Sequence, residues 1–428
     1  MAFARPVWGI NHVLSYGQSY AHGWEGAPAL TRVPHPGTLM LGESVRPFSE
    51  FAPEWRPVGA PVFQPLTATV QQHFGGPVLP PDAPGLLGET ILETALCHWQ
   101  ARMQQDGVAD PARRLLASAC GVGGRPIEAL SRGADPALFD RLRDCTRAAR
   151  DAAHLDGASY GITAILLLQG EHNNFAMGGT SEIAAYVALL RQLHADIVEQ
   201  LAQRIAGQQA APALFTYQTG GLQASETNSI AQAQLLGALT LPGCFMVGPA
   251  YFVTTNSDHP DANGHRWLGA QFGKVLHCVL TRGAAWRPLH PVAAMRDGVA
   301  VRLHFHVPCP PLAWGTPYIR QRANEVPDRG FQLLDAGGEV PIAAVELSGP
   351  DEVCITASRP LSGPVRVRYA NAARGGCGNL RDSDPAVSDA CYEYTSGAGH
   401  RKSAEIPELI GRPYQLHNWC VAFTQPVP

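Results

Sequence analysis

The sequence predicts an α/β protein in which a five-stranded, doubly wound parallel sheet is followed by a small antiparallel β-sandwich. Three observations support this fold class. Strand-like and helix-like segments alternate over the first two-thirds of the 428 residues, the strand-like segments are apolar on both faces, and a period-two pattern begins after Pro288. Alternating strands and helices are typical of a parallel sheet with helices on both faces, which gives a three-layer architecture.

Five segments have the features of buried strands. Residues 160–168 are almost entirely apolar, as expected for a strand that is covered on both faces. The first two predicted strands are followed closely by Gly17 and Gly121, which favour turns at their ends. In chain order the predicted strands are 7–16, 114–119, 160–168, 213–217 and 244–247.

Apolar residues at helical spacing separate these strands. Over residues 182–205, apolar side chains recur every three or four positions, so that one face of a helix would be buried. The same pattern predicts helices over residues 86–103, 138–149, 182–205, 225–239 and 261–280.

Two regions break the alternation. Residues 23–85 are dense in Pro, Gly and aromatic side chains, which favours a long, ordered and functional insertion. After Pro288, Val301, Leu303 and Phe305 alternate with polar residues, as in antiparallel strands. We therefore expect an α/β unit at 1–287, a β-sandwich at 288–375 and an extension at 376–428 that packs on the body.

The composition excludes several other classes of protein. Hydrophobic residues make up 45% of the chain, charged residues only 16%, and there are 44 glycines and 36 prolines. Gly and Pro together form roughly one-fifth of the residues, against about 12% on average, which excludes a coiled coil, a helical bundle and a disordered acidic protein. The net charge is −4 and no basic stripe is present, so neither nucleic acid nor an anionic membrane is expected as a partner.

The sequence carries only weak signals for its compartment. No basic region followed by an apolar stretch marks a signal peptide, so we expect a cytoplasmic protein, although export of a processed chain stays open. The longest uncharged run, 228–257, is interrupted by prolines and favours a helix, turn and strand over a membrane span. None of the ten cysteines forms a C-x-x-C pair, and free thiols are favoured over a disulfide among Cys377, Cys391 and Cys420.

Polar side chains and glycines follow four of the predicted strands at their carboxyl ends, where open α/β sheets bind ligands. These segments are Gly17-Gln18-Ser19, Gly121 to Gly124, Gln169-Gly170-Glu171-His172-Asn173 and Asn256-Ser257-Asp258-His259. A hydroxyl, glycine turns, amides and an Asp-His pair therefore meet at one edge of the sheet. These are the parts of a serine hydrolase: a nucleophile, oxyanion donors and a base.

The four segments resemble the sequence blocks of the SGNH (GDSL-like) hydrolase superfamily, in the branch of the sialate O-acetylesterases and carbohydrate acetylesterases. Residues 17–19 resemble its G-Q-S block. Its glycine block is resembled by Gly123-Gly124 with Ile127 and Leu130. Residues 169–171 resemble its Q-G-E block, and residues 258–260 resemble its D-x-H-P or D-x-x-H block. The resemblance covers roughly residues 7–285. It implies a flavodoxin-like catalytic unit and a serine esterase that needs neither a metal nor another cofactor.

The positions of these residues suggest their roles. Ser19 would follow a buried strand, at a turn whose free N–H groups favour an oxyanion. His259 would take the proton of Ser19 and return it to the leaving alcohol, with Asp258 orienting the ring.

Backbone and amide groups would hold the oxyanion and the substrate. The N–H groups of Ser19 and Gly124, together with the amide of Gln169 or Asn173, are the expected oxyanion donors. Gln18 is a further candidate for substrate binding. Glu171 is more typical of a structural acceptor than of an acid catalyst.

Two departures from the family pattern leave alternatives open. Family members place the acid two or three residues before the histidine, whereas Asp258 is adjacent to His259. Asp258 can serve if the loop bends; otherwise Asn256 or a backbone carbonyl orients the ring, and the site is a dyad. In the third block His172-Asn173 stands where Ser-Asp or Asn-Asp is common, which leaves the oxyanion amide open.

The histidines outside these blocks predict no metal site. His304 and His306 share one strand face and His290 lies upstream, but two such histidines without a nearby third ligand are more typical of a surface.

The sequence thus predicts a serine esterase that removes a small acyl group, acetyl by the family resemblance, from a small-molecule or polysaccharide ester. One alternative is an SGNH esterase, thioesterase or lipase of other acyl specificity. Another is a non-catalytic carbohydrate-binding or virion-type structural protein, in which the weakened Asp258/Asn256 arrangement reflects lost activity. The oligomeric state is left open.

Overall fold

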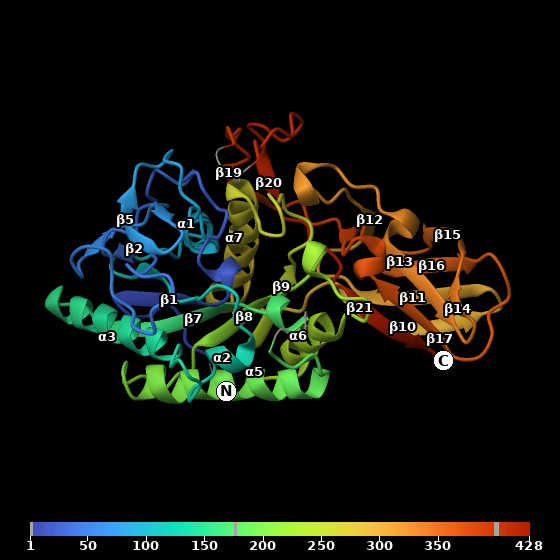
Figure 1. The fold of residues 1–428 in the computed structure, drawn as a ribbon, viewed down its shortest axis with the longest axis horizontal. Coiled ribbons are helices and arrows are strands. Elements are labelled where there is room, and N and C mark those ends of the chain that lie inside the picture. The colour runs from blue at the N-terminus through green and yellow to red at the C-terminus, as the bar shows by residue number, and fades with distance from the viewer. Residues whose placement is uncertain (1–2, 175–177, 398–401) are drawn as a thin grey trace.

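A seven-stranded, mostly parallel sheet forms the centre of the computed structural model, which describes residues 3–174, 178–397 and 402–428 (Figure 1). The strand order is β3-β2-β6-β1-β7-β8-β9, and neighbouring strands are parallel except for β2 with β3. The strands are β1 (Ile10–Gly17), β2 (Thr38–Leu41), β3 (Phe63–Pro65), β6 (Arg114–Ala119), β7 (Tyr160–Leu168), β8 (Ala213–Gln218) and β9 (Cys244–Pro249).

Helices cover both faces of this sheet, so β1 and β7 are buried along their whole length. Consecutive residues of β1 show the two faces: Val13 packs with α1 and α7, whereas Leu14 packs with α3, α5 and α6. Figure 1 shows α3 and α5 below the sheet and α7 above it. The main helices are α1 (Ile91–Gln105), α3 (Asp140–Leu155), α5 (Ile183–Ile197), α6 (Ser229–Thr240) and α7 (Ala262–Leu276).

Helices α1 and α7 pack against each other through two glycines of α7. A Cβ atom at Gly269 would lie 2.5 Å from the carbonyl oxygen of Ile91, and one at Gly273 would lie 2.5 Å from that of Ala95. Only glycine permits such an approach of two backbones. Because α7 begins just after the loop 256–260, this packing fixes one end of that loop.

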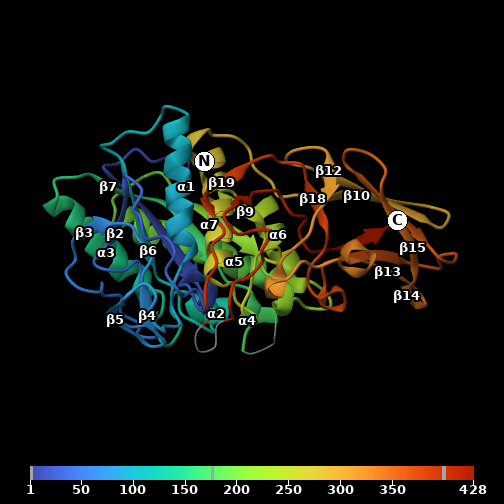
Figure 2. The same ribbon diagram turned by 90° about the horizontal axis from the view of Figure 1, so that it is seen from above.

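Two four-stranded antiparallel sheets lie beside the central sheet at one end of the molecule (Figures 1 and 2). Burial alternates along β11 and β16, and the buried side chains of the two sheets join one hydrophobic cluster. The first sheet contains β10 (His290–Asp297), β11 (Ala300–His306), β16 (Glu352–Ala357) and β15 (Ile342–Leu347). The second contains β14 (Gly338–Val340), β13 (Phe331–Asp335), β17 (Val365–Tyr369) and β21 (Phe423–Val427).

Shorter elements form the loops around these sheets. The paired strands are β4 (Val70–Gln72) with β5 (Gly75–Leu79), β12 (Leu312–Trp314) with β18 (Leu380–Asp382), and β19 (Val387–Cys391) with β20 (Pro413–Gln415). The short helical segments are η1 (Ser19–Ala21), α2 (Ile127–Leu130), α4 (Glu171–Asn174), η2 (Val198–Gln203), η3 (Gly221–Gln223), η4 (His277–Thr281), η5 (Ile319–Gln321), η6 (Pro327–Gly330) and η7 (Ala372–Arg374).

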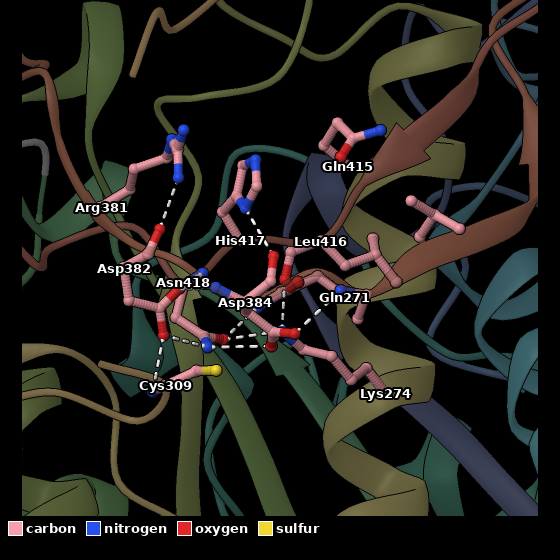
Figure 3. A network of polar contacts seen from close by, with 12 residues as sticks. Gln271, Lys274, Cys309, Arg381, Asp382, Asp384, Gln415, Leu416, His417 and Asn418 are labelled. Carbon is pink, nitrogen blue, oxygen red and sulfur yellow. Dashed lines mark hydrogen bonds and ion pairs between the residues drawn. The ribbon is translucent and has the colours of Figure 1, made fainter. Parts of the chain in front are cut away.

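A polar network fastens α7 to the C-terminal part of the chain (Figure 3). The ammonium group of Lys274 donates to Asp384 Oδ2 at 2.9 Å, to Asn418 Oδ1 at 2.7 Å and to the carbonyl of Leu416. The Asn418 amide in turn donates to Asp382 Oδ2 at 2.7 Å. The C-terminal segment thereby holds the helix that follows the loop 256–260.

The structure confirms the α/β class, the mainly parallel sheet and the additional antiparallel strands. The predicted number of five strands is wrong, because residues 23–85 supply β2 and β3 to the central sheet. These strands are short and lie within a Pro/Gly-rich region, so their apolar pattern is weak. The proposed division at 287 and 375 stays a prediction, although β21 comes from the predicted extension.

Two further expectations concern thiols and membranes. All ten cysteines lie in the described part of the chain and are free. Within the described residues, no helix has the length and apolar character needed to cross a bilayer.

Candidate active site

A cavity of about 340 Å³ lies where the loops after the parallel strands meet. Its walls come from the segments after β1, β6, β7 and β8, from the loop 256–259 and from the insertion 23–85. The lining residues are Gln18, Ser19, Trp24, Phe51, Gly123, Gly124, Glu171, His172, Gln223, Asp258 and His259. The structure therefore brings the four predicted sequence segments to one place.

Ser19 and His259 meet inside this cavity. The Ser19 Oγ atom lies 2.7 Å from Nε2 of His259, although 240 positions separate the two residues in the chain. Ser19 is 6% exposed and opens the short turn η1 directly after β1. This contact allows the ring to take the proton of the hydroxyl when its Nε2 is unprotonated.

Asp258 lies next to the other ring nitrogen. Its Oδ1 atom is 3.0 Å from Nδ1 of His259, but the contact is an ion-pair contact without good hydrogen-bond alignment of the ring N–H. The contact with His259 lowers the pKa of Asp258 well below its usual range, against an opposing effect of partial burial. The carboxylate is therefore ionised beside the ring.

A tight turn makes this contact between adjacent residues possible. The N–H group of Asn256 donates to the carbonyl of His259 at 3.0 Å, and Thr255 bridges to Pro260. The Asn256 side chain points elsewhere, because its amide donates to the carbonyl of Glu25 at 3.2 Å. The loop thus bends as one of the two sequence alternatives requires, and Asn256 holds the loop rather than the ring.

Glycines shape the backbone around Ser19. Gly17 has a φ of +129°, and a Cβ atom there would lie 2.0 Å from the carbonyl oxygen of Leu168. Gly124 lines the cavity with a φ of +62°. Both conformations strongly favour glycine, so the turns that face Ser19 depend on these residues.

The side-chain amides of Gln169 and Asn173 do not line the cavity. Gln169 Nε2 donates to Asn173 Oδ1 at 2.6 Å and to the carbonyl of Arg125 at 3.3 Å. Asn173 Nδ2 donates to Glu128 Oε2 at 3.1 Å and to the carbonyl of Thr180 at 3.0 Å. Each amide nitrogen carries two protons, and both protons are used in these contacts, so the two amides stabilise the turns behind the cavity.

Gln18 and Glu171 line the cavity as well. Gln18 Oε1 accepts hydrogen bonds from the N–H groups of His172 at 3.2 Å and Gly170 at 3.4 Å, which ties the loop after β1 to the loop after β7. Glu171 accepts a hydrogen bond from the hydroxyl of Tyr217. Burial raises the pKa of Glu171 above its usual value.

Several lining residues were not among the predicted site residues. Gln223 follows β8, the fourth of the predicted strands, and the rule that ligands bind at strand ends applies to it equally. Trp24 and Phe51 belong to the insertion 23–85, where only the density of aromatic residues gives a signal. Glu25 does not line the cavity but lies behind Ser257, with a φ of +59°, and nothing in its sequence context indicates this position.

One group of three acidic and histidine side chains in the described residues has the spacing of metal ligands. Donor atoms of Glu25, Asp258 and His259 lie within 4.8 Å of one another. The two carboxylates already accept hydrogen bonds from Ser257, and Asp258 accepts a further one from Gln223. Both carboxylates of the group are thus already used in protein contacts, and we assign no ion to it.

The fold is similar to that of known esterases. No protein-family model matches the sequence, and no curated protein matches it. A carbohydrate acetylesterase from Xanthomonas citri matches 97% of this chain and 80% of its own, with a TM-score of 0.58 and 13% identity. NanS covers 62% of this chain and 96% of its own, with a TM-score of 0.43 and 15% identity. A carbohydrate acetylesterase from Sinorhizobium meliloti covers 64% and 98%, with a TM-score of 0.33 and 11% identity.

The match to the Xanthomonas citri protein carries the structural comparison, because it includes both the central sheet and the antiparallel sheets. At 13% identity it shows a shared fold. The predicted likeness to carbohydrate acetylesterases is thus confirmed at the level of the fold.

Proposed function

We propose that this protein is a serine esterase that removes a small acyl group, acetyl in the first instance, from a carbohydrate. The observation that carries the proposal is the 2.7 Å contact between Ser19 Oγ and His259 Nε2 in a cavity at the carboxyl ends of the parallel strands. A serine hydroxyl is a weak nucleophile unless an adjacent base accepts its proton.

The proposed reaction has two steps. Ser19 Oγ attacks the ester carbonyl while its proton passes to His259 Nε2, and the imidazolium then protonates the departing alcohol. Water next attacks the acyl-serine with His259 again as the base, which releases the carboxylic acid and restores the hydroxyl of Ser19. Asp258 stabilises the imidazolium in both steps.

Backbone N–H groups are the proposed oxyanion donors. Ser19 contributes its own N–H group, and Gly124 contributes one from the turn after β6. Gln169 and Asn173 support the turns that carry these donors, because their amide protons are already used. Losing one oxyanion donor typically costs about 10²–10³ in rate.

The lining of the cavity supports a sugar as the alcohol. It combines the aromatic rings of Trp24 and Phe51 with the polar side chains of Gln223 and His172. A sugar ring has apolar C–H faces and hydroxyl edges, so it can use both kinds of group. A long acyl chain would instead need apolar side chains around its whole length.

Replacement of the nucleophile tests the proposal. Ser19→Ala should lower the turnover of p-nitrophenyl acetate by about 10⁴-fold or more, because the attacking oxygen is removed. Ser358→Ala, at an exposed serine of the antiparallel region, is the matched control and should retain activity. Unchanged turnover in Ser19→Ala would contradict the assignment.

Two further assays separate the alternatives. A fluorophosphonate probe should label Ser19 in the intact protein, whereas a non-catalytic binding or structural protein would stay unlabelled. Acetate release from acetylated polysaccharides and sialic acids, compared with hydrolysis of long-chain p-nitrophenyl esters, separates an acetylesterase from a lipase.

A further inference from the structure

The two oxygens of the Asp258 carboxylate are held from different directions. Oδ1 faces Nδ1 of His259 at 3.0 Å and accepts a hydrogen bond from Ser257 Oγ at 2.9 Å. Oδ2 accepts a hydrogen bond from Nε2 of Gln223 at 2.5 Å. Gln223 comes from the segment after β8, so a separate part of the fold holds the second oxygen.

Asp258 needs such a contact because its position next to His259 is weakly determined. The side chain is 46% exposed, and its contact with the ring lacks good hydrogen-bond alignment. A half-exposed carboxylate gains hydration by turning toward water. The short spacing in sequence therefore does not by itself keep the carboxylate against the ring.

Ser257 cannot do this alone. Its hydroxyl has one proton, and Glu25 Oε1 at 2.9 Å competes for it with Asp258 Oδ1. The backbone N–H group of Ser257 also donates to Glu25 Oε2, at 3.3 Å. The hydroxyl is thus shared between two carboxylates, whereas Gln223 donates to an oxygen that Ser257 does not contact.

Gln223 is itself held firmly. It is 7% exposed, its N–H group donates to the carbonyl of Gly220 at 3.2 Å, and its own carbonyl accepts from Asn174 Nδ2 at 2.9 Å. The adjacent turn is tied to the C-terminal part of the chain, where the N–H group of Gly221 donates to the carbonyl of Gly376 at 2.8 Å.

We propose that Gln223 is a positioning residue that keeps the Asp258 carboxylate against the far nitrogen of His259. The inference rests on the proposed function, since it gives Gln223 a role in the reaction through the Asp258–His259 pair. In the family pattern, an acid two or three residues before the histidine reaches the ring through the spacing itself. Here the Gln223 amide helps to hold the adjacent Asp258 against the ring.

Removing the amide of Gln223 should weaken the Asp258–His259 pair. Gln223→Leu removes the donor, so the carboxylate turns toward water and the imidazolium loses its counter-ion. The acid limb of the pH–rate profile should therefore move to lower pH by roughly one pH unit. In the Asp258→Asn background the carboxylate is already absent, so adding Gln223→Leu should produce no further shift.

The other titratable groups around the pair are the same in all variants. Glu25 lies behind Ser257, and Glu171 and His172 line the same cavity. The ring centroids of Tyr20 and His259 lie 5.6 Å apart, and the ring of Tyr20 also lies close to that of His265. A shift that depends on the Asp258 carboxylate therefore reports on the contact between Gln223 and Asp258.

The experiment combines kinetics with a measurement that needs no turnover. For p-nitrophenyl acetate, Gln223→Leu should lower kcat about tenfold while KM stays within about twofold. The NMR titration of the His259 ring, measured in the full chain, should shift in the same direction as the acid limb. Gln232→Leu removes a half-buried amide of α6 that donates to the carbonyl of Thr424, and it should change neither readout.

The outcomes separate this inference from the proposed function. If Gln223→Leu titrates like the wild type, or shifts the titration equally with and without the Asp258 carboxylate, the role of Gln223 is overturned. If the ring titration shifts as expected while wild-type Ser19 is neither labelled nor active, the proposed function fails and the contact between Gln223 and Asp258 stands.

Discussion

At the scale of single residues, the site depends on contacts between groups that are far apart in sequence or unusually close in it. Ser19 and His259 meet across 240 positions, whereas Asp258 and His259 are neighbours. The distant pair is placed by the sheet, because the loops that follow parallel strands lie on one edge. The adjacent pair is placed by a local turn and by side chains such as Gln223.

Gly17 is the residue at which the backbone of the site tolerates the least change. Gly17→Ala should destabilise the protein by about 3 kcal/mol or more and lower esterase activity, because the new Cβ would collide with the carbonyl of Leu168 beside Ser19. Gly157→Ala, with a φ of +68° and open space around it, tests the backbone strain alone and should cost about 1 kcal/mol. If urea unfolding showed the same loss of unfolding free energy in Gly17→Ala and Gly157→Ala, the predicted collision would be contradicted.

At the scale of elements, the insertion 23–85 and helix α7 position the site from two sides. The hairpin β4–β5 carries His73 at its tip. The centroid of the His73 ring lies 4.6 Å from that of Trp24 and 4.4 Å from that of Phe74. Phe51 completes this group, 5.9 Å from Phe74. A continuous aromatic surface therefore leads from the cavity to the outside.

The hairpin should affect large substrates more than small ones. Phe74 is 74% exposed, and Phe74→Ala removes the outer end of the aromatic surface. We expect KM to rise about fivefold or more for an acetylated oligosaccharide, given roughly 1 kcal/mol for a ring contact, and to stay constant for p-nitrophenyl acetate. Met295→Ala, at a 50% exposed residue of β10, is the control. Equal KM changes for both substrates would show that the surface does not bind the sugar.

The Lys274 network should be essential for the attachment of α7. Lys274→Met leaves the half-buried carboxylate of Asp384 without its cation, so we expect a loss of about 2 kcal/mol in the free energy of unfolding. The double variant with Asp384→Asn should recover part of this loss, because the uncompensated charge is removed. A loss below about 1 kcal/mol in the single variant would mean that the network contributes little.

At the scale of the whole molecule, buried carboxyl groups link stability to pH. Burial, with a smaller effect from Glu93, raises the pKa of Glu89 to about 7. Glu89 accepts hydrogen bonds from the N–H groups of Leu30 and Thr31, so it joins the insertion 23–85 to the start of α1. Burial also raises the pKa values of Glu171 and Asp261.

The sign of the pH dependence follows from the raised pKa. Between about pH 4.5 and 7 the folded state keeps a proton on Glu89 that the unfolded chain releases, so stability falls as the pH rises through this window. Glu89→Gln keeps the acceptor oxygen but cannot titrate. The fall in the free energy of unfolding across this pH window should therefore be smaller by up to about 3 kcal/mol. Chemical unfolding at several pH values measures the slope. A slope equal to that of the wild type would contradict the role of Glu89.

The sequence by itself determined the order of the main strands and helices, because apolar runs and helical spacing are local properties that burial imposes on the chain. It also indicated which strand ends would meet, since parallel strands present their carboxyl ends on one edge. Only the tertiary structure decided that β2 and β3 extend the sheet, that the amides of Gln169 and Asn173 are used behind the cavity, and that Gln223 holds Asp258. These outcomes depend on the direction of side chains from distant segments, and such directions are fixed by packing in three dimensions rather than by any local pattern.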